Sequence, residues 1–337
     1  MSTQLFNRVM CMTDMHFGLK YNSAQHNQDV IDYFNWFISE AKSRNCDTCI
    51  CLGDWHHHRS NISILTLDYT MKGLRLLNDN FKHTYILVGN HDLFYKERRE
   101  VHAMVVGQEF PNITIVDNIT VKDNVALVPW IVHDEWKSVK DIKAKYMFGH
   151  LELPGFYMNA MVKMPDTGEL SSTHLTAQDY VFSGHFHKRQ SNGNVHYIGN
   201  PFGHNYSDVG DFERGAMYLE WGGKPEYINY VDGPRYNTVT LTKLLENPDE
   251  YLTPKMHLQV TVDTDITYEE AAFLKETFTE KYKVREFKLI QTKSAEDDPD
   301  VEITSIQSVD QIVIDQLSAV ESKTLDTATL IQIYNDL

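Results

Sequence analysis

Cysteine is scarce in this chain, which contains only Cys11, Cys46, Cys49 and Cys51. The spacing of Cys46 and Cys49 matches the C-x-x-C pattern of zinc and redox sites, but there is no second cysteine pair to complete a zinc site. Cys49 and Cys51 also fall inside an apolar run, where a free cysteine behaves as a small hydrophobic residue. We therefore expect buried, reduced thiols, as in proteins of a reducing compartment.

Long apolar runs and a secretory leader are also missing. No run approaches the ~20 consecutive apolar residues of a membrane-spanning helix. The N-terminal residues lack the basic start, the apolar stretch and the small-residue cleavage site of a signal peptide. We expect a protein of the cytoplasm that does not enter a membrane.

Basic residues are outnumbered by acidic ones, and this bears on the class of partner. The formal net charge is −16. Because affinity for nucleic acid comes largely from Lys and Arg at phosphates, this balance argues against nucleic-acid binding. A function on DNA would need a local basic patch or a partner protein to supply positive charge, since bound divalent cations would offset only part of the deficit.

Histidine, by contrast, is abundant, and many of the 16 histidines follow apolar runs. The run at residues 49–52 predicts a buried strand, which ends at Gly53 and is followed by Asp54. A carboxylate at the carboxyl end of a buried strand lies where open α/β sheets place their ligand sites. We interpret Asp54 as a bridging ligand between two metal ions.

Polar groups follow four further predicted strands, at residues 8–12, 85–88, 146–148 and 180–183. These groups are Asp14 and His16, then Asn90, His91 and Asp92, then His150, and finally His185 and His187. On extended backbone, side chains two residues apart point the same way, so that Asp14 and His16 can bind one ion. Each motif alone is weak, but chance would rarely place all of them at successive strand ends.

The segments between these strands define the fold class. Residues 29–41 and 62–77 have the apolar periodicity of amphipathic helices. Strands that alternate with helices in this way are typical of an α/β sheet. Further strands are expected at 125–130, 215–221 and 226–230, so that residues 1–235 form one large domain.

Beyond residue 235 the pattern changes. A short helix at 240–246, a strand at 257–262, a helix at 268–282 and a strand at 284–291 predict a small βαβ-type domain over residues 236–293. An acidic, proline-containing linker is expected at 294–302. Residues 303–337 contain two amphipathic helices, at 309–320 and 324–334, whose apolar faces should dock on the main body or on a partner helix.

The strand-end motifs resemble those of a known family. DMHFG (14–18), GD (53–54), VGNHD (88–92), GH (149–150) and SGHFH (183–187) are similar to the blocks of the calcineurin-like metallophosphoesterases. The residues of these motifs resemble most those of the DNA-repair branch of the family, which includes the bacterial SbcD nucleases and the phage recombination exonuclease subunits. The resemblance is specific over residues 8–235 and only architectural beyond them.

The resemblance implies a four-layer αββα sandwich with a small C-terminal α/β capping domain and a helical tail. It implies that one metal ion is bound by Asp14, His16, Asp54 and His187, and a second by Asp54, Asn90, His150 and His185. His91 matches the catalytic histidine, with Asp92 to orient its ring. His57 matches a second catalytic histidine, although alignment with His56 or His58 stays open.

The implied activity is that of a DNA exonuclease or endonuclease. Two divalent ions, Mn²⁺ or alternatively Mg²⁺, would hold a bridging hydroxide that attacks a phosphodiester. The implied partners are DNA and an SbcC-like SMC-type ATPase, bound through residues 303–337 by a homodimer within a heterotetramer, in the host cytoplasm if the gene is carried by a phage. The alternatives are a phosphomonoesterase or cyclic-nucleotide phosphodiesterase of the same superfamily, and a non-catalytic scaffold for the ATPase.

Overall fold

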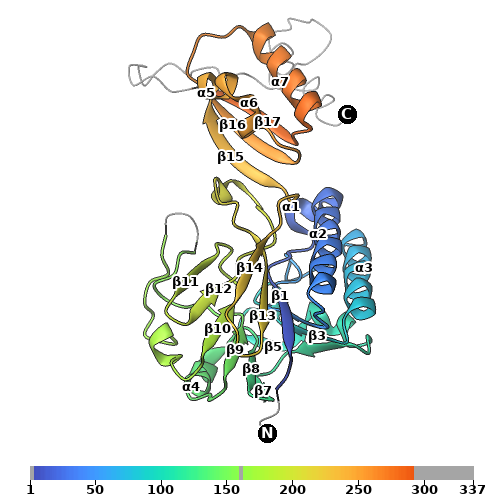
Figure 1. The fold of residues 1–337 in the computed structure, drawn as a ribbon, viewed down its shortest axis with the longest axis vertical. Coiled ribbons are helices and arrows are strands. Elements are labelled where there is room, and N and C mark those ends of the chain that lie inside the picture. Colours follow the sequence, from blue (N-terminus) through green and yellow to red (C-terminus); the bar gives the residue numbers. More distant parts are fainter. Residues whose placement is uncertain (1–3, 159–161, 292–337) are drawn as a thin grey trace, which may run out of the picture. The chain divides into compact units, whose positions relative to one another are not determined.

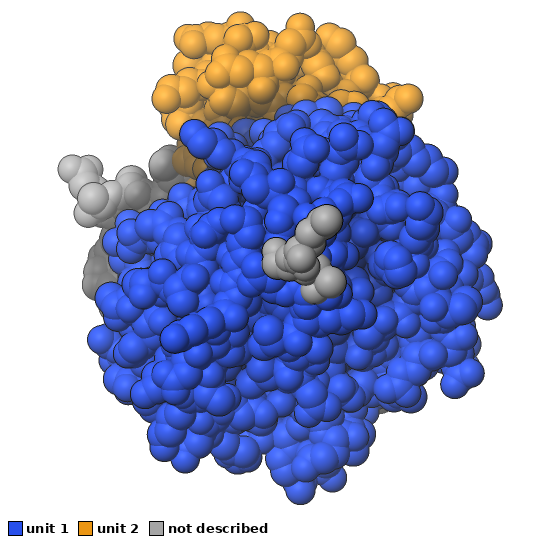
Figure 2. All heavy atoms as spheres, turned by 60° about the horizontal axis from the view of Figure 1, so that its bottom comes forward, with its two compact units in different colours: residues 1–236 blue, residues 237–337 orange. Residues whose placement is uncertain are grey.

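The structure, a computed structural model, describes residues 4–158 and 162–291. The chain divides into two compact units, residues 1–236 and 237–337, which are blue and orange in Figure 2. Among the described helices, none combines the length and the apolar composition needed to cross a bilayer.

The first unit contains two six-stranded sheets (Figure 1). The first sheet has the order β14-β13-β1-β2-β3-β6, in which the neighbours from β1 to β6 are parallel. Its strands are β1 (Arg8–Met12), β2 (Thr48–Cys51), β3 (His83–Leu87), β6 (Ile113–Val116), β13 (Gly215–Glu220) and β14 (Glu226–Asn229). The parallel strands bring their carboxyl ends to one edge of the sheet.

The second sheet has the order β11-β12-β10-β9-β8-β7, and its four inner strands are parallel. Its strands are β7 (Thr120–Lys122), β8 (Val125–Val128), β9 (Tyr146–Gly149), β10 (Tyr180–Ser183), β11 (Gln190–Asn192) and β12 (Val195–Tyr197). Both sheets therefore place the carboxyl ends of several neighbouring strands together.

Alternation along the strands builds the layers. In β1, Val9 and Cys11 face a core shared by the two sheets, whereas Met10 and Met12 face the helices α2 (Ala24–Ser43) and α3 (Ile64–Asn80). These helices lie side by side over the first sheet (Figure 1). The outer face of the second sheet is covered by α4 (Trp136–Val139) and by loop residues. This arrangement confirms the expected αββα sandwich.

Smaller elements complete the first unit. They are α1 (Leu19–Asn22), the hairpin strands β4 (Leu93–Tyr95) and β5 (Arg98–His102), and the 3₁₀ turns η1 (Ala103–Gly107), η2 (His133–Glu135), η3 (Ser172–His174) and η4 (Tyr206–Asp208). The four cysteines are free and buried, as expected.

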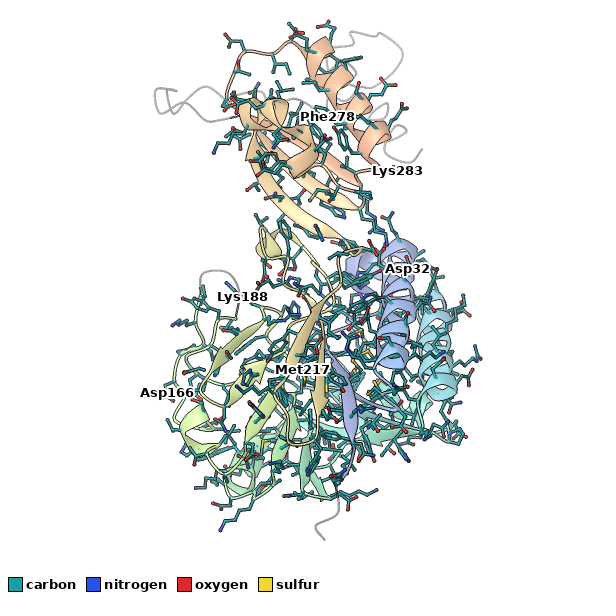
Figure 3. The ribbon with its side chains drawn as sticks, in the orientation of Figure 1. Asp32, Asp166, Lys188, Met217, Phe278 and Lys283 are labelled. Atoms are coloured by element: carbon teal, nitrogen blue, oxygen red, sulfur yellow. The ribbon has the colours of Figure 1, made fainter. Side chains whose placement is uncertain are left out.

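The second unit has its own core around a three-stranded sheet of order β15-β16-β17. Its elements are β15 (Arg235–Thr240), α5 (Leu241–Glu246), α6 (Pro248–Tyr251), β16 (Met256–Val262), α7 (Tyr268–Tyr282) and β17 (Glu286–Gln291). The parallel strands β16 and β17 are joined by α7, whose Phe278 is buried in this core (Figure 3). The sequence predicted the βαβ pattern but missed β15; the linker at 294–302 and the helices in 303–337 lie outside the described residues.

Candidate metal centre

The structure brings the predicted strand-end residues together in the first unit. Each belongs to the segment that follows a parallel strand: Asp14 and His16 follow β1, Asp54 follows β2, Asn90 and His91 follow β3, His150 follows β9, and His185 and His187 follow β10. The carboxylates and imidazoles form overlapping groups whose ligand atoms lie within 4.8 Å of one another. Residues scattered along the chain therefore converge on one centre.

The backbone at these positions differs from the expectation. Extended chain was predicted to align Asp14 with His16, but both residues adopt left-handed backbone, with φ of 56° and 49°. Asp54 and His185 share this conformation, with φ of 54° and 83°. Left-handed backbone costs energy for residues other than glycine, and such strain collects at functional sites. The convergence therefore comes from strained turns after the strands rather than from strand alternation.

The first candidate ion site, called site one, lies between Asp14, His16, Asp54 and His187. The Nε2 atom of His16 lies 3.1 Å from Nε2 of His187 and 3.7 Å from Oδ2 of Asp54. It lies 4.0 Å from Oδ1 of Asp14. Carboxylate oxygens and imidazole nitrogens that face one another across such distances can share one divalent ion.

The second candidate ion site, called site two, lies between Asp54, Asn90, His150 and His185. The Oδ1 atom of Asn90 lies 2.9 Å from Nε2 of His150 and 3.0 Å from Nδ1 of His185. Nδ1 of His150 lies 2.6 Å from the carbonyl oxygen of Leu52, so this nitrogen carries the proton that it donates. The other nitrogen, Nε2, faces site two and is the atom that can bind an ion once it has lost its proton.

Asp54 faces both sites through different oxygens. Its Oδ2 is directed at His16 in site one, and its Oδ1 lies 3.4 Å from Nε2 of His150 in site two. The backbone N–H of His91 also donates to Oδ1, at 2.9 Å. A Cβ atom on Gly89 would stand 2.2 Å from this oxygen, so only glycine fits beside the carboxylate. The position suits a ligand shared by two ions.

The three consecutive histidines have different environments. His57 belongs to a close group with His16 and His91, and its ring stacks on that of His91 with centroids 5.3 Å apart. The ring of His56 instead contacts Thr70 through Nε2 at 2.9 Å. The ring of His58 contacts that of His57, with centroids 4.9 Å apart, but among the described residues His58 belongs to none of the close groups of possible ligands. Of the three, His57 is the one placed to act at the centre.

Asp92 does not orient His91 in the way expected. The Nδ1 atom of His91 instead donates to the carbonyl oxygen of His57, at 2.7 Å. The Asp92 carboxylate accepts the backbone N–H groups of Trp55, His56 and Gly89. Asp92 thus ties the turn after β2 to the turn after β3, and it supports the His91 position through the backbone.

The protonation of the cluster follows from burial and from its own charges. Burial raises the pKa of Asp14 to about 7, although His150 opposes the shift. Burial also raises the pKa of Asp54, but His150, His16 and His91 outweigh it and hold that pKa well below its ordinary value. For His150, burial lowers the pKa, but Asp54 and Asp14 overcome it and raise the pKa to about 9. Burial lowers the pKa of His16, so its ring is neutral at pH 7.

Two residues at the centre were not predicted from the sequence. Glu152 lies with Oε1 3.3 Å from Nε2 of His185, on the ring nitrogen opposite to the one that faces Asn90. His204 joins His16 and His187 in a close group of imidazoles. Glu152 follows the predicted ligand His150 by two residues, whereas His204 belongs to none of the five strand-end motifs.

A buried cluster of carboxylates, imidazoles and an amide at the strand ends of an αββα sandwich defines a metal-dependent phosphoesterase. The sequence profile of the calcineurin-like phosphoesterase family matches residues 7–189. The chain belongs to this family. The expected class of enzyme is thereby confirmed, and the family implies bound divalent metal ions, for which this donor set is suited.

Particular relatives extend the comparison beyond the matched region. The chain is 25% identical to Exonuclease subunit 1 of Enterobacteria phage T4, over 98% of either chain. It is 26% identical to Putative phosphoesterase 244L of Invertebrate iridescent virus 6, over 76% of this chain and 92% of the relative. Among solved structures, Pseudomonas putida nuclease MPE is 17% identical over 56% of this chain and 66% of its own, with a TM-score of 0.29.

Proposed function

We propose that the chain is a two-metal-dependent DNA nuclease that hydrolyses phosphodiesters. The observation that carries this proposal is the orientation of Asp54, whose two carboxylate oxygens face two separate groups of ligands. Asp14, His16 and His187 complete site one, while Asn90, His150 and His185 complete site two. Mn²⁺ is the proposed ion, because the donors are a mixture of carboxylate, amide and imidazole groups.

Two bound ions would clamp the phosphodiester, lower the pKa of a water molecule and neutralise charge on the phosphate oxygens. The protein's own part is to hold this arrangement and to move a proton. Because Nδ1 of His91 is engaged by the carbonyl of His57, Nε2 is the atom left to donate a proton to the leaving oxygen. His57, stacked on His91, would help to orient it, and Asp92 holds together the two turns that carry them.

The choice of DNA as substrate draws on the relative named Exonuclease subunit 1, which the chain matches over nearly its full length. The net charge of −16 opposes this choice, but the charge is unevenly distributed. Residues 294–337 contain ten acidic residues and one lysine, which leaves residues 1–293 with a net charge of −7. The acidic linker and the C-terminal segment together therefore account for −9 of the net charge of −16.

The proposed assembly is an SbcC-like SMC-type ATPase bound to a homodimer of this chain. The word "subunit" in the name of the phage relative supports a multi-protein enzyme. Residues 303–337 are the segment proposed to bind the ATPase coiled coil. The proposed roles in DNA recombination, repair and replication, and the choice between exonuclease and endonuclease activity, follow from this assembly.

The deciding experiment compares substrates under one set of conditions. The metal-free protein is given Mn²⁺ and end-labelled linear duplex DNA, a closed circular DNA, a phosphomonoester and a cyclic nucleotide, with and without the partner ATPase. Cleavage of linear DNA at a far higher rate than that of the small esters is expected. Preferred turnover of the small esters would replace the nuclease by a phosphomonoesterase or cyclic-nucleotide phosphodiesterase. A protein that takes up no ion at all would revive the scaffold alternative.

A further inference from the structure

His204 lies in a buried position that leaves its ring without protein partners. Its side chain is in the loop between β12 and η4, and the residue is 2% exposed. In the described part of the chain, neither Nδ1 nor Nε2 of its ring has a hydrogen-bond partner. Buried polar atoms are nearly always hydrogen-bonded, so two unsatisfied nitrogens on one ring require an explanation. A metal ion bound by the ring would explain why these nitrogens have no hydrogen-bond partner in the protein.

The ring of His204 is directed at site one. The ligand nitrogens of His16, His187 and His204 all lie within 4.8 Å of one another. The ring centroid of His204 is 5.5 Å from that of His16 and 5.2 Å from that of His187. Since Nε2 of His16 and Nε2 of His187 are 3.1 Å apart, the three imidazoles surround one small volume.

The backbone of His204 is fixed independently of any ion. Its N–H donates to Oδ2 of Asp208 at 2.7 Å, and Nη2 of Arg214 donates to Oδ1 of the same carboxylate at 2.9 Å. Nη1 of Arg214 donates to the carbonyl oxygen of His187 at 3.1 Å. Arg214 is only 3% exposed, so one buried guanidinium connects the His204 segment to the backbone of His187. Such preorganisation is what a ligand position requires.

We propose that His204 is an additional ligand of the ion at site one, which is then bound by three imidazoles and two carboxylates. The inference rests on the metal centre proposed above. Imidazole suits Zn²⁺, Fe²⁺ and related ions, whereas carboxylate and carbonyl oxygens suit Mg²⁺ and Mn²⁺. His204 therefore shifts the preference of site one toward the nitrogen-seeking ions, while site two keeps an amide oxygen.

The test uses Co²⁺, whose visible absorption reports its ligands, on the full chain stripped of metal. Calorimetric and spectroscopic titrations compare the wild type with His204→Gln and His204→Asn. His102→Gln, which removes a buried histidine outside the cluster, is the control. We expect the wild type and the control to bind two ions. Both His204 variants should bind one ion with at least about tenfold lower affinity and with an altered spectrum, and their preference for Zn²⁺ over Mn²⁺ should fall.

Several outcomes would overturn the inference. Equal affinity and an unchanged Co²⁺ spectrum in the His204 variants would exclude ligation, whatever happens to activity. If the variants do not fold, proton NMR of the Co²⁺-loaded wild type replaces them, and the absence of a shifted imidazole signal from His204 beside those of His16 and His187 would contradict the proposal. A wild type that binds no Co²⁺ would instead remove the metal centre on which the proposed function depends, so that the two failures are distinguishable.

Discussion

Site one and site two share Asp54, yet their other ligand side chains differ. In site one, the side chain of His16 is 3% exposed and that of Asp14 is fully buried, while His187 is partly exposed. In site two, His150 is fully buried, while the side chain of His185 is 16% exposed and its outer nitrogen contacts Glu152. The two sites are therefore similar in burial and differ in their ligand groups, since site two includes the amide oxygen of Asn90 and site one does not.

The protonation of the two sites also differs. His16 and His187 have pKa values lowered by burial, to about 4 for His187, so both rings are neutral at pH 7 and ready to bind an ion. The pKa of His150 in site two is raised to about 9, so this ring must lose a proton before it binds an ion. Ion binding at site two should therefore be the more sensitive to pH and to changes in neighbouring side chains.

The largest expected effect comes from the residue that the two sites share. Asp54→Asn removes the charge that faces both groups of ligands, so both ions should be lost or greatly weakened. Activity should fall by at least about 10³-fold, since charge stabilisation at the reacting phosphate goes with the ions. Atomic absorption after dialysis against Mn²⁺ measures the loss. Asp47→Asn, at an exposed carboxylate paired with Lys82, is the control. Retention of two ions by Asp54→Asn would show that the sites do not share this ligand.

The next effect separates metal binding from proton transfer. His91→Gln should retain both ions, because His91 is placed beside the centre by a backbone carbonyl rather than among the proposed ligands. Turnover should fall by about 10²–10⁴-fold, the usual contribution of a general acid. Calorimetry and single-turnover DNA cleavage measure the two quantities, with His58→Gln as the matched control. Cleavage near the wild-type rate would refute the role of His91.

Much of the fold and of the metal centre could be predicted from the sequence, because polar residues that directly follow apolar runs mark the ends of core strands. Apolar runs followed at once by Asp, Asn or His predicted the core strands and seven candidate ligands, and the structure places those side chains together. The βαβ pattern of the second unit was also predicted from the sequence, and α7 lies at the expected residues. Parallel strands that share an edge make such sites readable from spacing alone.

Other features depend on tertiary structure and left no local signal. The left-handed backbone of Asp14 and His16 was not predicted from the sequence, because even Asp and His, which adopt it more often than most residues, do so in only a small fraction of cases. Asp92 was expected to orient the ring of its neighbour His91. Its carboxylate instead accepts hydrogen bonds from backbone N–H groups in the turn after β2. His204 reaches the centre only because Arg214 and Asp208 hold its loop, and those contacts do not exist in the sequence.

Site two should respond to a change outside its ligands. Glu152 accepts from the nitrogen of His185 that faces away from Asn90, and a carboxylate in that position fixes the ring and raises its basicity. Glu152→Gln should weaken the ion at site two by about tenfold or more and leave site one unchanged. Glu169→Gln is a matched control, because Glu169 lines the same cavity as Glu152. Calorimetric titration with Mn²⁺ resolves the two sites, and equal weakening of both would contradict the assignment of Glu152 to site two.

The smallest expected effect is a difference in pH dependence. The pKa of His150 is raised to about 9 in the ion-free protein, so the ring is protonated between pH 7.5 and pH 9 and an ion at site two must displace that proton. Affinity at site two should therefore rise with pH by up to about tenfold per pH unit and level off above about pH 9. At site one, the pKa of Asp14 is about 7 and the histidines are neutral, so its affinity should change little over the same range. Calorimetry in buffers of different ionisation enthalpy counts the protons released, and proton release of the same size at both sites would contradict the contrast between them.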